Sequence, residues 1–355
     1  MSGKGESKRQ LQSHLTTIAL HNKYGSLVRI APNVVSISDP SEIPKIYNIK
    51  GNFTKTAFYP IWSMSWKKVP QMNLFSNRDE GEHREYKKKV ANAYTLESLL
   101  KMEPSIDDCS KLFLTRLGEF ADRNEAVDLG EWLQYYAFDV VGEVTFDKKL
   151  GFIEKGGDVD GMIAAIEGLL VYATQIGQIP EAHPFLLGNP LFPILLPQME
   201  TWNSVLNFTL KAINARTKMS RDGELELEGG RDGNDMLTRW AAAKAFDPLK
   251  MSTRDVIVSL STNVLAGSDT TAIALRAILY FLMKNPAKME KLKKEIEDAD
   301  IAGKLSNPIS DKAARTELPY LNADIPGGTI VGINAWALHY DPDVFPNPEA
   351  FEPER

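Results

Sequence analysis

The chain has 355 residues, of which 43% are hydrophobic and 25% are charged. These proportions are typical of a soluble globular protein, and the length predicts one large domain or two smaller ones. The formal net charge of -6 is mild, and no extended basic tract occurs. This charge pattern argues against a nucleic-acid-binding protein.

Cysteine and histidine are too sparse for the common side-chain metal sites. Cys109 is the only cysteine, which excludes a disulfide framework and any zinc site built from several cysteines, and fits a reducing compartment. The five histidines show no HExxH spacing. The sequence therefore predicts no metal ion held by a cluster of these side chains.

The N-terminal thirty residues, which begin MSGKGESKRQ, are polar and contain no apolar signal-peptide core or membrane-spanning run. We therefore expect a cytoplasmic chain without a transmembrane anchor. The next stretch, SLVRIAPNVVSIS (26–38), alternates in polarity and predicts two short strands about a turn at Pro32 and Asn33. With a second alternating segment, 329–336, these strands predict a small mixed sheet.

Helical spacing dominates the middle of the chain. It runs from residue 82 to about residue 146, where Cys109 lies on an apolar helix face, and it resumes over 161–219. Residues 220–235, SRDGELELEGGRDGND, are charged and glycine-rich and predict a surface loop. The predicted fold class is therefore mainly α with a small β-sheet.

The longest predicted helix covers residues 253–284, a length of about 48 Å. Ser252 and Asp255 form a capping box at its start, and Asn285 with Pro286 stops it. Apolar residues surround the helix axis, so we expect burial on nearly every face. These residues are Val256, Ile257, Val258, Leu260, Val264, Leu265, Ile273, Leu275, Ile278, Leu279 and Phe281.

The middle of this helix contains AGSDTT, residues 266–271, which helix propensity disfavours. Glycine costs ~1 kcal/mol relative to alanine there, and serine, aspartate and threonine compete for backbone hydrogen bonds. A buried carboxylate at Asp269 is costly unless it is paired or hydrated. One interpretation is a groove beside Gly267 where a small polar ligand meets a proton path through Asp269 and Thr270. The other is a polar surface stripe with a helix-packing glycine.

Three segments, in this order along the chain, resemble the cytochrome P450 family, and most closely its fungal pisatin-demethylase-like group. AGSDTT resembles the oxygen-activation helix. HREYKKKVANAY (83–94) resembles the helix in which a His or Trp and, four residues later, an Arg contact the heme propionates. PGGTIVGINAWALHYDPDVFPNPEAFEPER (326–355) resembles the strand and meander that lead to the P-E-R motif. The resemblance extends over nearly the whole chain.

The resemblance implies a cytochrome P450 fold, a heme cofactor and monooxygenase activity in fungal secondary or xenobiotic metabolism. It implies proton relay by Asp269 and Thr270, and a position beside the heme for Ala266 and Gly267. An alternative for Asp269 is an ion pair with a nearby cation. The implied substrate is an apolar small molecule, and the implied partner is NADPH-cytochrome P450 reductase.

Two further groups of residues receive roles from the resemblance. His83 and Lys87 would bind a heme propionate, although Lys87 replaces the family's arginine and lacks its bidentate geometry. The lysine run of Lys87, Lys88 and Lys89 has the alternative interpretation of a solvated helix face. The aromatic-rich TAFYPIWSMSW (56–66) falls where the family has a substrate-recognition loop, or it is a loop packed by its own rings. The residues implied in substrate binding are Phe58, Tyr59, Trp62 and Val264.

The chain departs from the family pattern in two places. In the family, a segment like LPYLNA (318–323) continues into a helix with an E-x-x-R motif, but here Asp324 and a Pro-Gly-Gly turn follow directly. We therefore predict an internal deletion at 323/324. The family's heme-binding cysteine loop follows P-E-R, and this sequence ends at Arg355.

These departures predict a single, incomplete cytochrome P450 domain over residues 1–355 that lacks the thiolate ligand. Cys109 is outside any ligand-loop pattern and is interpreted as a core cysteine. Family members are usually anchored at the endoplasmic reticulum by an N-terminal helix that this sequence does not contain. Two functions remain open: a monooxygenase represented in part, and a non-enzymatic relative that binds no heme.

Overall fold

The computed structural model describes residues 13–48, 53–66, 69–187, 201–219, 225–227 and 233–321. Its residues fall into two compact units. The larger unit covers residues 54–284 and 306–311, and the smaller unit contains the described residues before 54, with 285–305 and those from 312 onward. The predicted strand at 329–336, the junction at 323/324, the P-E-R motif and most of the 220–235 loop lie outside the described residues.

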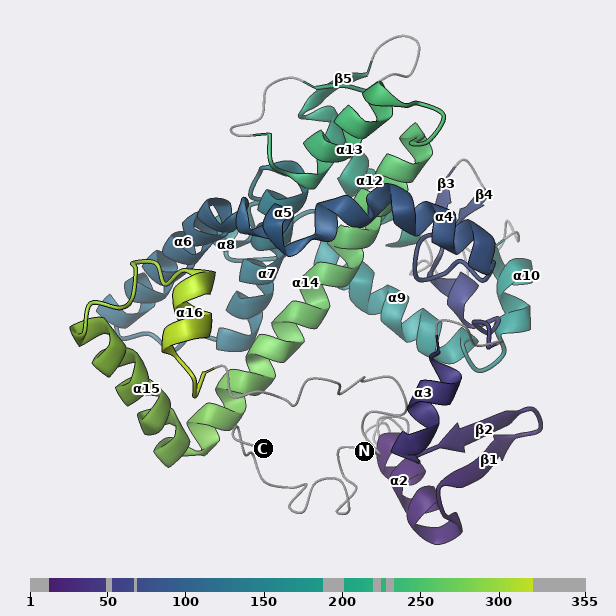
Figure 1. The fold of residues 1–355 in the computed structure, drawn as a ribbon, viewed down its shortest axis with the longest axis horizontal. Coiled ribbons are helices and arrows are strands. Elements are labelled where there is room, and N and C mark those ends of the chain that lie inside the picture. The colour runs from purple at the N-terminus through teal and green to yellow at the C-terminus, as the bar shows by residue number, and fades with distance from the viewer. Residues whose placement is uncertain are drawn as a thin grey trace, which may run out of the picture. The chain divides into compact units, whose positions relative to one another are not determined.

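The larger unit is mainly helical (Figure 1). Its α-helices are α4 (Glu80–Val90), α5 (Leu96–Leu100), α6 (Glu103–Asp122), α7 (Leu129–Phe146), α8 (Phe152–Lys155), α9 (Met162–Ile176), α10 (His183–Leu187), α12 (Thr201–Asn214), α13 (Met236–Phe246) and α14 (Thr253–Lys284). Its short 3-10 helices are η2 (Tyr59–Trp62), η3 (Ala91–Tyr94) and η4 (Pro180–Ala182), and its strands are β3 (Met64–Trp66), β4 (Val69–Gln71), β5 (Thr217–Met219) and β6 (Leu225–Leu227).

The smaller unit contains α2 (Ser13–Tyr24), β1 (Leu27–Ala31), β2 (Val34–Ile37), η1 (Pro40–Glu42), α3 (Ile43–Ile46) and α15 (Pro286–Ile301). Helix α16 (Asp311–Glu317) begins where the two units meet in the sequence. Strands β1 and β2 pair antiparallel, with Leu27 opposite Ile37 and Ala31 opposite Val34. The predicted two strands about a turn at Pro32 and Asn33 are therefore confirmed.

Helix α14 is the central helix of the larger unit, and its predicted bounds, 253–284, are confirmed. It packs against α7, α12 and α13 (Figure 1). Val256, Leu260 and Val264 have no exposed surface and belong to the main core of the unit. Burial of such side chains is the dominant stabilising contribution in a helical fold, so the N-terminal half of α14 organises the helices around it.

The second half of α14 differs from the prediction of burial on nearly every face. The apolar side chains of Ile273, Ile278, Phe281 and Met283 are between 43% and 57% exposed, whereas Ala272 and Leu282 are buried. The prediction was wrong for this half because composition reveals that a helix is apolar but not which neighbours cover it. The exposed residues are spread along this half of the helix and leave it as an exposed apolar segment.

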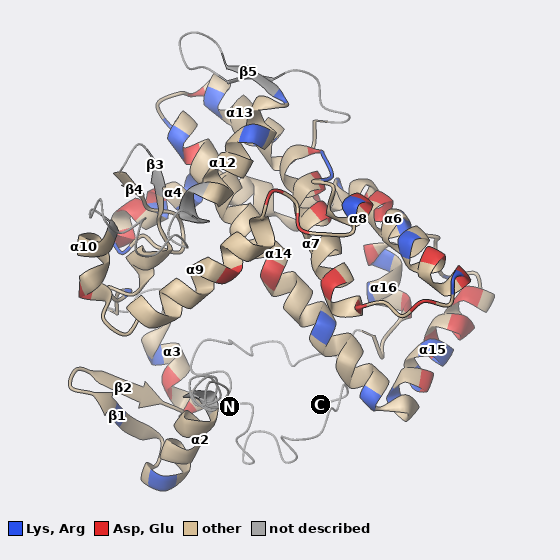
Figure 2. Ribbon diagram, turned by 180° about the vertical axis from the view of Figure 1, so that it is seen from behind, with Lys and Arg blue, Asp and Glu red and all other residues tan. Residues whose placement is uncertain are grey.

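Charged side chains are frequent on some helices and rare on others. Figure 2 shows Lys, Arg, Asp and Glu along α15, whereas α9 and α12 are almost free of charge. Helices α9 and α12 pack against each other in the larger unit, and they bury Leu169, Val205 and Leu206. The mainly α fold with small antiparallel β-pairs matches the predicted fold class.

Candidate functional site

The start of α14 is fixed by the predicted capping box. The backbone N–H of Asp255 donates to the Ser252 hydroxyl at 3.1 Å, and the backbone N–H of Ser252 donates to the Asp255 carboxylate at 3.2 Å. These bonds satisfy two backbone donors that a helix start would otherwise leave unpaired.

The AGSDTT segment lies where α14 crosses α7. A Cβ atom on Gly267 would lie 2.9 Å from a methyl carbon of Val141 on α7, so glycine permits this close approach. The Ser268 hydroxyl donates to the carbonyl of Val264 at 2.8 Å, and the Thr270 hydroxyl donates to the carbonyl of Ala266, also at 2.8 Å. Gly267 is therefore a helix-packing residue.

Asp269 and Thr270 are adjacent in sequence but face different surroundings. The Asp269 carboxylate accepts a hydrogen bond from the Gln134 amide on α7 at 3.2 Å. Thr270 and Ala266 are exposed, one turn apart, on the uncovered face of α14. At Gly267 the structure matches the second of the two alternatives, a polar surface with a helix-packing glycine, because Val141 fills the space beside Gly267 where the first placed a groove.

His83 and Lys87 both lie on α4, as predicted. His83 is half-buried, and burial, with the nearby charge of Lys55, lowers the pKa of its imidazole. Lys55 donates to the carbonyl of Leu74 at 2.8 Å, and burial lowers its pKa. Lys87 is exposed, and its side chain makes no hydrogen bond or ion pair within the described part of the chain. Lys55 is therefore a third basic residue beside His83 that the sequence did not indicate.

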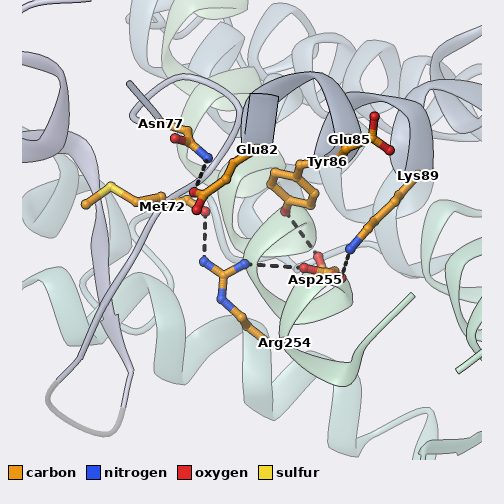
Figure 3. Close-up of a pocket in the computed structure, with 8 residues that line it drawn as sticks. All are labelled: Met72, Asn77, Glu82, Glu85, Tyr86, Lys89, Arg254 and Asp255. Atoms are coloured by element: carbon orange, nitrogen blue, oxygen red, sulfur yellow. Dashed lines mark hydrogen bonds and ion pairs between the residues drawn. The ribbon is translucent and has the colours of Figure 1, made fainter. Parts of the chain in front are cut away.

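The other face of α4 is tied to the start of α14 beside a pocket of ≈ 330 Å³ (Figure 3). Lys89 donates to the Asp255 carboxylate at 2.9 Å, and Arg254 donates to its other oxygen at 3.3 Å. The Tyr86 hydroxyl is 2.7 Å from the Ser259 hydroxyl and donates to the backbone carbonyl of Asp255 at 3.2 Å. Interpreting Lys89 as a solvated lysine was therefore wrong, because a buried carboxylate 166 residues away binds it.

The aromatic residues predicted for substrate binding form one cluster with a ring from outside the predicted loop. Phe58, Tyr59 and Trp62 contact one another or Phe75, with ring centroids between 5.0 and 6.2 Å apart. A Cβ atom on Gly177, just after α9, would lie 2.6 Å from Phe58, so the loop packs tightly beneath α9. The Nε1 atom of Trp62 is buried and has no hydrogen-bond partner among the residues that the structure describes.

Val264, also predicted to contact substrate, is fully buried in the main core. Cys109 lies on α6 and is likewise fully buried, as predicted. Burial, with a smaller contribution from Glu143, raises the pKa of the Cys109 thiol to about 12. A thiol in such surroundings stays protonated and unreactive.

A family model described as Cytochrome P450 matches residues 4–324 and, as a second match, 321–355. A cytochrome P450 monooxygenase from Aspergillus terreus is 32% identical over 94% of this chain and 73% of its own length. The monooxygenase cicH of Emericella nidulans is 33% identical over 97% of this chain and 74% of its own.

The chain belongs to the cytochrome P450 family. A further relative is the pisatin demethylase of Fusarium vanettenii, 30% identical over 96% of this chain and 70% of its own length. The predicted fungal P450 resemblance is thus confirmed, and with it the family's monooxygenase function, heme cofactor and place in secondary metabolism. Proteins of this family act on small molecules and receive electrons from a redox partner.

The family's heme iron is held by a cysteine thiolate, which makes the iron reactive toward oxygen. Cys109 is the only cysteine among these 355 residues, and it is fully buried on α6 with its pKa raised. A thiolate ligand needs a lowered pKa and an accessible sulfur. The residues present therefore do not fit a thiolate-bound iron, although His83 and Lys55 suit an anionic group.

Within the described residues, α14 is long and apolar enough to cross a membrane, with 17% of its most apolar window buried. Core helices of soluble proteins have the same length and composition. The described residues contain no group of three or more His, Cys, Asp or Glu side chains placed to hold a metal ion.

Proposed function

We propose that this P450 is a monooxygenase for an apolar small molecule in fungal secondary metabolism, and that residues 1–355 carry its oxygen-activation and substrate side without the iron ligand. The single observation that carries the proposal is α14, in which Ala266 and Thr270 face outward one turn apart while Asp269 bonds to α7. A hydroxyl and a carboxylate at such a surface can hold and move protons.

The other roles follow the surroundings of each residue. Lys87 and Lys55 supply positive charge, and the imidazole of His83, whose lowered pKa favours the neutral form, supplies a hydrogen-bond donor, which together suit the carboxylates of a heme. Phe58, Tyr59 and Trp62 supply an aromatic wall for an apolar substrate, and Phe75 extends it. Val264 would act from beneath the surface, by setting the packing of α14, because its own side chain has no exposed area.

The proposal also includes the electron-transfer partner and the location in the cell. NADPH-cytochrome P450 reductase is the electron donor expected for a fungal enzyme of this family. The endoplasmic reticulum membrane, where family members are usually anchored, is the expected site of action. The proposal includes no nucleic-acid partner.

We further propose that residues 1–355 form one incomplete domain with an internal deletion at 323/324. Two observations support it: the family model matches in two pieces that meet at 321–324, and LPYLNA is followed at once by a Pro-Gly-Gly turn. The missing segment would contain the helix with the E-x-x-R motif, which normally pairs with the P-E-R arginine. Loss of buried ion-pair partners typically costs ~3–5 kcal/mol.

The test compares two proteins by the carbon monoxide difference spectrum of the reduced form. The 355-residue chain is expected to give no peak characteristic of thiolate ligation. A chimera with the E-x-x-R helix and the cysteine loop of a close relative is expected to give that peak. A thiolate peak from the chain itself that disappears in Cys109→Ser would contradict the proposal.

The chimera also tests the residues of α14. Thr270→Ala is expected to raise the share of NADPH consumed without product, and Asp269→Asn to slow turnover roughly ten-fold or more while heme binding persists. Thr271→Ala is the matched control, with a much smaller effect. Unchanged coupling and rate in both variants would leave the polar centre of α14 with a packing role only.

A second function is supported by the burial of Cys109. On this alternative the protein is a degenerate P450 relative that binds no heme and at most retains an apolar ligand. A chimera that folds but gives neither a thiolate peak nor turnover would favour it.

A further inference from the structure

The Asp269 carboxylate belongs to a polar ladder between α7 and α14. The Arg276 guanidinium donates through Nε to the carbonyl of Gly130 at 2.7 Å and through Nη2 to the Gln134 Oε1 atom at 3.0 Å. Gln134 in turn donates through Nε2 to the Asp269 Oδ1 atom at 3.2 Å. Gln134 is 8% exposed, so these bonds are made largely out of water.

Helical spacing places the members of the ladder face to face. Gly130 and Gln134 are four residues apart on α7, and Asp269 and Arg276 are two turns apart on α14. A Cβ atom on residue 130 would lie 3.3 Å from the Arg276 Nε atom, so the glycine admits the guanidinium. The close approach of the helices at Gly267 brings Asp269 within reach of Gln134.

The direction of the ladder follows from the chemistry of its ends. A guanidinium only donates hydrogen bonds, so Arg276 holds the oxygen of the Gln134 amide toward itself. The amide nitrogen must then point to Asp269, which as a carboxylate only accepts. With the amide reversed, its nitrogen would face the donors of Arg276 and its oxygen would face the carboxylate of Asp269, so both hydrogen bonds would be lost.

We propose that Gln134 is the positioning residue for Asp269 and that Arg276 sets the orientation of the Gln134 amide. The neutral amide keeps the two charges apart, so Arg276 does not bind the carboxylate directly. Asp269 is held through Oδ1 alone, and Gln134 is its only partner among the described residues. This inference rests on the proposed role of Asp269 in moving protons, because such a group must be oriented without being immobilised in an ion pair.

The test uses the full 355-residue chain, labelled with 15N, and follows the Gln134 side-chain amide by NMR. Its signals are assigned by their loss in Gln134→Leu. In the unmodified chain they are expected to shift when acid protonates the carboxylate that the amide contacts, and Asp269→Asn is expected to abolish that shift. Asp128 lies beside Gly130, so Asp128→Asn serves as the control that leaves the shift in place.

Arg276→Met removes the group that orients the amide. The amide then has no strong preference between its two orientations, so the pH-dependent shift is expected to fall to about half. Arg123→Met, which removes one positive charge at the end of α6, is the matched control and is expected to leave the shift unchanged. A full shift in Arg276→Met would overturn the orienting role of Arg276, and no shift in the unmodified chain would overturn the contact itself.

A double-mutant cycle provides a second measurement if a variant gives poor spectra. Gln134→Leu and Asp269→Asn, alone and together, are compared by urea unfolding. The pair is expected to be non-additive by roughly 2- to 10-fold in the unfolding equilibrium constant, and strict additivity would refute the coupling. Unchanged turnover in the chimera's Asp269→Asn variant would refute the role of Asp269 in moving protons. It would leave the NMR and unfolding results unaffected, so failure of the proposed function and failure of this inference are distinguishable.

Discussion

Replacing the buried Asp255 by asparagine tests how α4 is tied to α14. The Asp255 side chain is 7% exposed and accepts from Lys89 and Arg254, whose side chains are 31% and 37% exposed. A hydrogen bond to a charged group contributes ~1.5–3 kcal/mol, but both cations recover water when the carboxylate is lost. Asparagine also retains an oxygen for the capping box. We therefore expect Asp255→Asn to lower the free energy of unfolding by about 1–2 kcal/mol near neutral pH.

The pH dependence of this loss is the more discriminating result. Burial raises the pKa of Asp255, but hydrogen bonds from Lys89 and Ser252 outweigh it, so the pKa is lowered overall. A carboxyl with a lowered folded-state pKa adds stability above its unfolded-state pKa, and that stability disappears as the pH falls through the folded-state value. The difference between Asp255→Asn and the unmodified chain should therefore shrink on acidification.

The assay is urea unfolding followed by far-UV circular dichroism at neutral and at strongly acidic pH. Glu85→Gln, which removes the exposed partner of Lys88 on the same helix, is the control and is expected to give no measurable change. A difference for Asp255→Asn that is equally large at both pH values would refute the electrostatic explanation and leave only packing.

Three other predictions follow from packing and burial. Gly267→Ala should not give the stabilisation of ~1 kcal/mol expected from helix propensity, because the added methyl group would contact Val141 too closely. Gly118→Ala on α6, where an added methyl group has no described neighbour within 4 Å, should give that stabilisation. Equal changes in melting temperature for the two variants would contradict this. Cys109 should react slowly with a thiol reagent in the native chain and rapidly in urea, because its pKa is raised to about 12; equal rates would show that the sulfur is accessible. The Glu295 carboxylate accepts hydrogen bonds from the backbone N–H groups of Tyr320 and Leu321 at 2.6 and 3.0 Å, so Glu295→Ala should speed hydrogen exchange at both groups. Unchanged exchange would show that these hydrogen bonds are not maintained in solution.

The sequence predicted the features that depend on local patterns. The bounds of α14 followed from a capping box, an apolar run and an Asn-Pro stop, and the turn between β1 and β2 followed from polarity alternation. The burial of Cys109 followed from its place on an apolar helix face. These signals act over a few residues, so one sequence contains them in full.

Features that join distant segments could not be predicted in this way. Nothing near Lys89 distinguishes it from Lys88, yet Lys89 binds Asp255 while Lys88 faces solvent. The same is true of Gln134, which is an ordinary helix residue until α14 places Asp269 and Arg276 opposite it. The resemblance to a family indicated Asp269, but only the packing of α7 on α14 indicates which residue orients it.

The exposed apolar segment in the second half of α14 also affects how the protein behaves in solution. A row of half-exposed isoleucine, phenylalanine and methionine side chains attracts other apolar surfaces, and the attraction strengthens with protein concentration and with salts that are excluded from protein surfaces. A mild net charge of -6 provides little electrostatic repulsion against it. Preparations of this chain should therefore be monodisperse only when dilute or in detergent, and a single charged residue in place of Ile278 should extend the range of concentrations at which it remains so.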